Sequence, residues 1–205
     1  MAENYTEEED KLISWFKENY KNMIIGIVLG TILVIGYNYQ QDNALNSQYE
    51  ISLKYETALV GYQENEYADI LALSDELSKN DPENIYASLV QLYAAKIHHD
   101  KKQYDKALSS LNHVILYSKS DEILNIAKLR SARILIYLKR YDEAKDKIIS
   151  IENYASQVIP TELLGDVEYY SNNLKEAKKI YQLSLDNEMT PNKRKIIENK
   201  INSIN

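Results

Sequence analysis

The stretch that decides the fold is Tyr104-Asp105-Lys106-Ala107, which returns as Tyr141-Asp142-Glu143-Ala144 and again as Leu174-Lys175-Glu176-Ala177. A weaker copy is Tyr67-Ala68-Asp69-Ile70, so the steps between copies are 37, 37 and 33 residues. Twelve positions before the end of each copy stands a small residue: Ala58, Ala95, Ala132 or Gly165. Periods in the thirties with two helices per unit are typical of an α-solenoid. We therefore predict an all-α fold of about four divergent helical hairpins, followed by a C-terminal helix.

The spacing of these residues fits a helical hairpin. Two helices approach to about 8–10 Å only where a side chain at their crossing is small. We therefore expect each small residue to lie in a first helix and each Tyr-x-x-Ala group to open a second. Larger residues then fill the space between the helices: Leu111, Ile148 and Tyr181. We also expect Asp81-Pro82 and Thr190-Pro191 to begin helices, because each places a capping side chain before a proline.

A second feature is an uncharged stretch of twenty residues, 22–41. A helix of this length covers about 30 Å, the thickness of the hydrocarbon core of a bilayer. A cleaved signal peptide is the competing interpretation. However, the preceding segment is acidic at Glu7–Asp10, and the sequence after the apolar run lacks the small residues of a cleavage site. We therefore predict an uncleaved transmembrane helix that contacts the lipid bilayer.

The distribution of lysines predicts the orientation of this helix. Lys11, Lys17 and Lys21 precede it, whereas Lys54 is the only basic residue in the twenty positions that follow. The positive-inside rule places the N-terminus in the cytoplasm. We thus expect a cytoplasmic tail over residues 1–21, a transmembrane helix over 22–41 and an exported repeat domain over 42–205.

The composition excludes several functions. The net charge is −7 and no basic stripe is present, so nucleic acid is not an expected partner. The chain contains no cysteine, and His98 and His99 are neighbours that point in different directions on a helix, so we expect no metal site. The sequence contains no Gly-rich phosphate loop and no nucleophile elbow. We therefore expect a protein without enzymatic activity, cofactor or small-molecule substrate.

Two sets of residues are candidates for binding. Gly26 and Gly30, with Gly36 further on, offer a close-packing face to another transmembrane helix, although this spacing is also common in apolar spans. The first helices of a solenoid line a groove that binds peptides. The repeat register places seven residues on that face: Arg130, Arg133, Tyr137, Glu162, Asp166, Tyr169 and Tyr170. The alternative for these seven is a solvated helix surface.

The repeat pattern resembles the tetratricopeptide repeat, most closely from Leu164-Gly165 through Ala177 and Tyr181 to Pro191. The order of acidic tail, single glycine-containing span and divergent repeats resembles the YfgM family over essentially the whole chain. That family is the ancillary subunit of the SecYEG translocon in Gram-negative bacteria. The resemblance implies an inner-membrane protein with a periplasmic repeat domain. It also implies two partners, the SecYEG translocon and a membrane-anchored periplasmic chaperone of the PpiD type.

Two functional hypotheses follow. The first is a non-catalytic scaffold or co-chaperone that links the export channel to periplasmic chaperones through its repeat domain. The alternative is a membrane-anchored regulator that sequesters an envelope-stress signalling factor or a cell-division factor. A scaffold needs the exported domain, whereas a regulator is able to act through the cytoplasmic segment 1–21.

Overall fold

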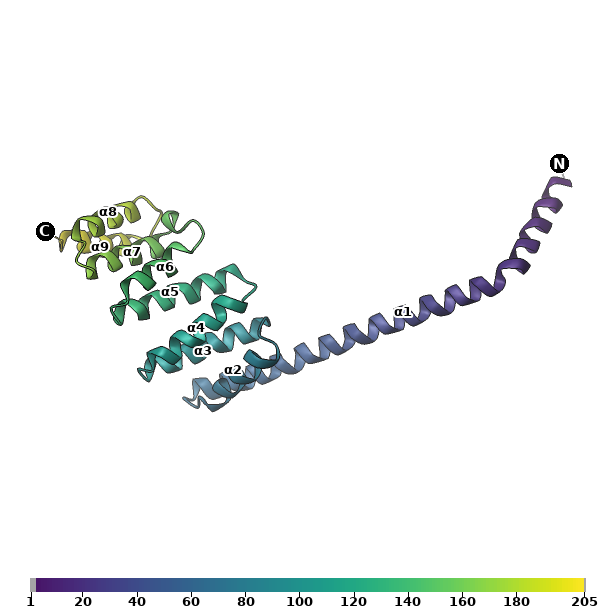
Figure 1. Cartoon of the computed structure of the whole chain (residues 1–205), viewed down its shortest axis with the longest axis horizontal. Coiled ribbons are helices and arrows are strands. Elements are labelled where there is room, and N and C mark those ends of the chain that lie inside the picture. Colours follow the sequence, from purple (N-terminus) through teal and green to yellow (C-terminus); the bar gives the residue numbers. More distant parts are fainter. Residues whose placement is uncertain (1–2, 205) are drawn as a thin grey trace. The chain divides into compact units, whose positions relative to one another are not determined.

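The computed structural model describes residues 3–204, without the side chains of residues 3–8, 43 and 44, and this part consists of helices joined by turns. Residues 1, 2 and 205, at the ends of the expected tail and repeat domain, lie outside it. The described part contains no strand (Figure 1). Its helices are α1 (Glu3–Gln63), α2 (Ala68–Asn80), α3 (Ile85–Asp100), α4 (Tyr104–Tyr117), α5 (Asp121–Tyr137), α6 (Tyr141–Ile149), the short 3-10 helix η1 (Tyr154–Ser156), α7 (Val158–Tyr170), α8 (Leu174–Leu185) and α9 (Pro191–Asn202). The expected all-α fold is confirmed.

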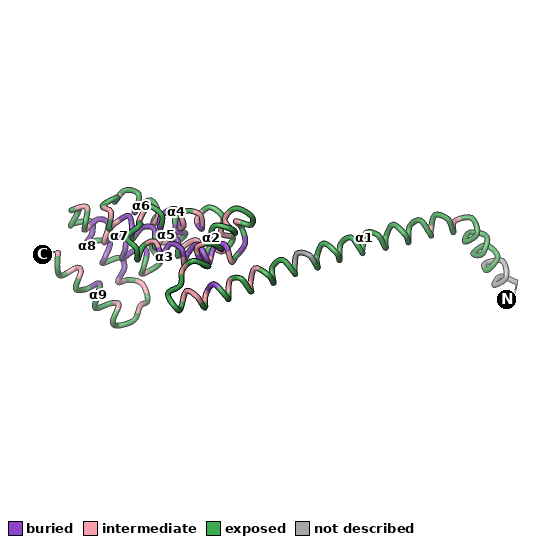
Figure 2. The backbone as a smooth tube through the Cα atoms, turned by 90° about the horizontal axis from the view of Figure 1, so that it is seen from below, coloured by how far each residue is buried: buried purple, intermediate pink, exposed green. Residues whose placement is uncertain are grey.

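The chain divides into two units, Met1–Leu53 and Lys54–Asn205. The described part of the first unit belongs to α1. An 18-residue window of this helix reaches a mean hydropathy of 1.6, and none of that window is buried. The side chains of Ile24 and Leu33 are 54% and 73% exposed, and Figure 2 shows α1 exposed along this stretch. By length and composition this helix is able to cross a bilayer.

Helix α1 continues without a break past residue 42, where we expected the exported domain to begin. Its residues 54–63 belong to the second unit. There, the ammonium group of Lys54 pairs with the carboxylate of Glu76 in α2 at 2.7 Å. The rings of Tyr55 and Tyr62 pack against Tyr86 and Tyr93 of α3, with centroids 5.2 and 4.8 Å apart. The end of α1 is therefore the first helix of the first repeat.

The second unit is a series of helical hairpins. Residues 54–63 of α1 pair with α2, α3 pairs with α4, α5 with α6 and α7 with α8, while α9 packs on α8. Figure 1 shows the hairpins following one another in chain order. The repeat-defining residues are all buried, namely Ala58, Ala95, Ala132 and Gly165 in the first helices and Ile70, Ala107, Ala144 and Ala177 in the second. This confirms the expected tetratricopeptide-like repeats.

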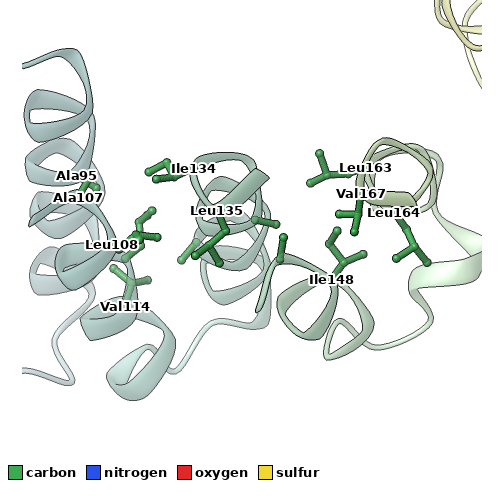
Figure 3. Packing of buried hydrophobic residues seen from close by; sticks show 14 of the residues in the cluster. Ala95, Ala107, Leu108, Val114, Ile134, Leu135, Ile148, Leu163, Leu164 and Val167 are labelled. Carbon is green, nitrogen blue, oxygen red and sulfur yellow. The ribbon is translucent and has the colours of Figure 1, made fainter. Parts of the chain in front are cut away.

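One hydrophobic core runs through the middle hairpins, as Figure 3 shows. Leu111 is 1% exposed and Ile148 is fully buried, in the positions expected to fill the space between paired helices. A smaller cluster continues the packing at the C-terminal end, where Tyr181 and Ile197 are buried together. Burial of this kind contributes about 25 cal/mol per Å² of apolar surface. The main core is continuous from α3 to α8 and holds the first helices of the middle hairpins in place.

Each hairpin turn contains one residue with positive φ, two positions before the start of the Tyr-x-x-Ala group. These residues are Asn65, Lys102, Lys139 and Asn172, with φ angles of 64°, 59°, 59° and 66°. The next amide donates to the carbonyl five residues earlier, for example from Gln103 to His98 at 2.8 Å. This Schellman arrangement satisfies carbonyl groups at the end of the first helix. The four units therefore share one turn geometry despite their different turn residues.

The start of α3 differs from the prediction. Asp81 caps the end of α2, since its amide donates to the carbonyl of Leu77 at 3.0 Å, and Pro82 lies in the turn that follows. Helix α3 begins only at Ile85, because the side chain of Asn84 accepts the amide of Tyr86 at 2.9 Å. The prediction of an N-cap at Asp81 was therefore wrong.

The start of α9, in contrast, is confirmed. The side chain of Thr190 accepts the amide of Lys193 at 3.3 Å, and Pro191 is the first helical residue.

Candidate functional site

A pocket of about 360 Å³ opens between α3 and α5 in the second unit. Its base is formed by buried residues of the core, among them Ala95 and Leu111. Its polar side chains come from the two facing helices and are Lys96, His99 and Asp100 of α3 and Arg130 and Arg133 of α5. Two of the residues predicted for the groove, Arg130 and Arg133, are therefore brought together at one site.

The charges around this pocket are unequally paired. The carboxylate of Asp100 accepts from Lys96 at 2.9 Å and lies 3.2 Å from Nδ1 of His99. The hydrogen bonds from Lys96 and His99 hold the pKa of Asp100 below its usual value. Arg130 directs Nη1 toward the carbonyl of Leu92 at 3.5 Å. Among the described residues, no carboxylate lies within 4 Å of either Arg130 or Arg133, so the pocket carries an excess of positive charge.

Aromatic rings continue the surface beyond the pocket. The ring of His99 contacts Tyr104 in an edge arrangement with centroids 5.7 Å apart, and Tyr104 in turn contacts Tyr137 at 4.9 Å. Tyr137 is 67% exposed. A cationic pocket and an exposed tyrosine thus lie on the same pair of helices, an arrangement suited to binding a polypeptide through ion pairs and ring stacking.

Glu162 and Asp166, which were also predicted for the groove, contact the C-terminal helix. Glu162 is 8% exposed and pairs with Lys193 and, at 2.8 Å, with Lys200 of α9. Lys200 also pairs with Asp166 at 2.6 Å, and the hydroxyl of Tyr181 donates to the same carboxylate oxygen at 2.6 Å. Both carboxylates therefore hold α9 against the fourth hairpin.

The pKa values of this network follow from its contacts. Burial alone raises the pKa of Glu162, but hydrogen bonds from Lys193 and Lys200 outweigh it and leave the pKa below its usual value. Burial alone lowers the pKa of Lys200, yet its bonds to Asp166 and Glu162 raise it above the usual value. Glu162 and Lys200 therefore each favour their charged forms in the folded protein.

The two remaining groove candidates are adjacent tyrosines near the end of α7. Tyr169 is half-buried and packs against the cluster that contains Ile197, whereas Tyr170 is 57% exposed. Their rings meet edge to face with centroids 5.4 Å apart. Of the fourth-unit candidates, only Tyr170 therefore has most of its side chain exposed.

Lys96, His99 and Tyr104 belong to the pocket region but were not selected from the sequence. A signal for Lys96 was present, because Lys96 follows Ala95 as Arg133 follows Ala132. Applying the repeat register to the second unit as well as the third places Lys96 on the same face as Arg133.

The glycines of the apolar helix are exposed, and a side chain added at Gly26, Gly30 or Gly36 meets nothing within 4 Å. At 3.6 residues per turn, Gly26 and Gly30 lie about 40° apart around the helix, whereas Gly36 lies about 120° from Gly30. The narrow small-residue face is therefore formed by Gly26 and Gly30. Within the described residues, no group of three His, Asp or Glu side chains is able to hold a metal ion.

The fold defines the class of this protein: a helical-repeat protein of the tetratricopeptide type that carries an apolar helix long enough to span a membrane. The tetratricopeptide repeat-like domain family matches residues 13–205, and the chain belongs to that family.

Curated relatives match nearly the whole chain, and those described here are named ancillary SecYEG translocon subunit. The protein from Aggregatibacter actinomycetemcomitans is 29% identical over 187 residues, which cover 89% of this chain and 91% of the relative. The protein from Escherichia coli strain K12 is 24% identical over 204 residues, 100% of this chain and 98% of the relative. A relative from Buchnera aphidicola of Acyrthosiphon pisum is 28% identical over 185 residues, 90% and 95% of the two chains. These matches confirm the resemblance to the YfgM family. That family is non-catalytic.

Proposed function

We propose that this protein is an ancillary subunit of a SecYEG-type translocon, anchored in the inner membrane by residues 22–41. The observation that carries the proposal is the match to ancillary SecYEG translocon subunits over nearly the full length of both chains, apolar helix and repeats together. A match that covered only the repeats would support a fold alone, because tetratricopeptide-like domains serve many functions.

The proposed orientation has the N-terminus in the cytoplasm and the repeat domain in the periplasm. Its support is the lysine distribution, with Lys11, Lys17 and Lys21 before the span and only Lys54 in the twenty residues after it. The exported repeat domain, residues 42–205 in this proposal, then stands beside the exit of the channel.

Contact with the translocon inside the bilayer uses the face of Gly26 and Gly30. Small residues allow two helix backbones to approach closely, and packing of this kind drives helix association in lipid. Since no side chain in the described part of the chain covers these glycines, the face is open to a partner helix.

The repeat domain acts as a scaffold that holds a membrane-anchored periplasmic chaperone of the PpiD type near the channel. Its support is the pocket between α3 and α5, which has exposed cations and, beside them, aromatic rings of the kind that bind polypeptides. Two proteins confined to one membrane surface have a high effective concentration, so weak contacts are sufficient for association.

The test is recovery of translocon subunits by crosslinking and affinity purification from membranes in mild detergent. We expect the double variant Gly26→Leu with Gly30→Leu to insert normally and to recover less translocon. The matched control is Val28→Leu with Ile32→Leu, which changes the opposite face of the same helix and keeps the spacing. Equal recovery with both double variants removes the glycine face from the proposal. Failure to recover any translocon with the unaltered protein rejects the function.

A further inference from the structure

The pocket between α3 and α5 holds two guanidinium groups that the described part of the chain leaves without a carboxylate. Asp100, the single carboxylate that lines the pocket, is already bonded to Lys96 and lies beside His99. Arg130 and Arg133 therefore lie above an apolar base with no carboxylate of the described residues paired to them. Guanidinium groups bind carboxylates through paired, charge-assisted hydrogen bonds, so the chemistry of the pocket favours an acidic group from a partner.

An exposed ring, that of Tyr137, follows the second of these cations by one helical turn. Tyr137 follows Arg133 by four residues on α5, which places it one turn further along the helix, about 6 Å away in rise. In an extended peptide, side chains two residues apart point to the same side and are separated by about 6.6 Å. The spacing between Arg133 and Tyr137 therefore matches two alternate side chains of an extended peptide.

We propose that this pocket binds an extended peptide segment in which an acidic residue and an aromatic residue stand two positions apart. The carboxylate bonds the guanidinium group of Arg133, with Arg130 beside it, and the aromatic ring stacks on Tyr137. The inference rests on the proposed function, because it specifies the chemistry of the partner that the repeat domain holds.

The test is fluorescence anisotropy with the full-length protein in phosphatidylcholine nanodiscs and labelled peptides of defined sequence. The first probe is the amidated peptide Gly-Ser-Glu-Ser-Trp-Ser-Gly. One control replaces Glu by Gln, and a second, Gly-Ser-Ser-Glu-Trp-Ser-Gly, keeps the composition but makes the acidic and aromatic residues adjacent. We expect each control to bind about fivefold more weakly. The first loses the charged hydrogen bond, and in the second the adjacent side chains of an extended peptide point to opposite sides.

Variants of the protein test the same contacts from the other side. We expect Arg130→Gln with Arg133→Gln to weaken the first peptide by about tenfold or more, and Tyr137→Ala by about threefold or more. The matched control is Lys106→Gln with Lys175→Gln, which removes two exposed cations outside the pocket and should bind as the unaltered protein does. Circular dichroism is used to check that each variant is folded. Where a variant is not folded, the peptide series with the unaltered protein still tests the proposal.

The outcomes separate the inference from the proposed function. Binding that ignores the peptide spacing, or that is unaffected by the two arginine substitutions, overturns the inference. Complete displacement of the first peptide by inorganic phosphate, together with equal binding of a peptide in which Ser replaces Trp, indicates a general anion site. This result overturns the inference as well. Spacing-dependent peptide binding without recovery of translocon subunits rejects the proposed function, and recovery of translocon without any peptide binding rejects the inference alone.

Discussion

The ring of Tyr181 packs directly against the backbone of Gly165. A Cβ atom added at Gly165 would lie 2.5 Å from Cδ1 of Tyr181 and 3.1 Å from Cζ. The second and third units have alanine at the small position, at Ala95 and Ala132, and an aliphatic residue four positions after the Tyr-x-x-Ala alanine, Leu111 and Ile148. The fourth hairpin thus combines the smallest residue with the largest partner.

This relationship predicts that the effect of Gly165→Ala on stability changes sign when Tyr181 is replaced by a smaller residue. In the unaltered protein, crowding against Tyr181 should lower the free energy of unfolding by about 1–2 kcal/mol, after the gain in helix propensity is included. In a Tyr181→Leu background the same substitution should raise it by about 0.5–1 kcal/mol. Urea unfolding followed by circular dichroism measures both effects. The same sign in both backgrounds would show that the crowding is not the reason for the glycine.

The hairpin turns give a second prediction. Lys102 and Lys139 adopt the left-handed conformation, which costs a side-chain-bearing residue about 1 kcal/mol more than glycine. We expect Lys102→Gly and Lys139→Gly each to raise the free energy of unfolding by about 0.5–1 kcal/mol. The neighbouring substitution Lys101→Gly, at a φ of −82°, serves as control and should give no gain. A gain with Lys101→Gly equal to the other two would contradict the explanation.

Acid should weaken the attachment of α9. Because the pKa of Glu162 is lower in the folded protein than in the unfolded chain, the unfolded chain binds more protons as the pH falls. The contribution of Glu162 to the free energy of unfolding is present above its unfolded pKa of about 4.5. It is lost as the pH falls through the folded pKa. For Lys200 the pKa is raised, so its contribution is lost only as the pH rises above about 10.5.

The measurement is the urea midpoint of the unaltered protein and of Glu162→Gln between neutral pH and pH 3. We expect the variant to be less stable at pH 7 and the difference to narrow below about pH 4.5. A difference that stays constant across this range would mean that the charge of Glu162 does not stabilise the helix.

The proposed orientation is testable because the chain contains no cysteine. A single cysteine introduced by Ser14→Cys or Ser203→Cys is therefore the only thiol. We expect a membrane-impermeant maleimide to label Ser203→Cys in intact spheroplasts and to label Ser14→Cys only after lysis. The reverse pattern would place the repeat domain in the cytoplasm and exclude a periplasmic scaffold.

The sequence was sufficient to predict the repeats because their signals are local and periodic. The distance from Ala95 to Ala107 recurs from Ala132 to Ala144, and burial of all four residues follows from that spacing. The start of α3 was not predictable in this way, since both Asp81 and Asn84 are capping residues near a proline. The choice between them depends on the packing of Asp81 at the end of α2.

The candidate site was predictable only in part. Arg130, Arg133 and Tyr137 lie together because one helix carries them all. Glu162 and Asp166 contact lysines of α9 that lie 31 to 38 residues later, and such contacts depend on how the last helix packs rather than on any repeating pattern.

The most direct test of the account compares the full-length protein with a variant whose residues 22–41 are replaced by an unrelated transmembrane helix. Both are crosslinked in membranes and purified in mild detergent, and the recovered proteins are identified by mass spectrometry. The account predicts translocon subunits with the natural anchor, far fewer with the replaced anchor, and a periplasmic chaperone with both. Recovery of a cytoplasmic signalling or cell-division factor, with no translocon subunit from either form, would contradict it.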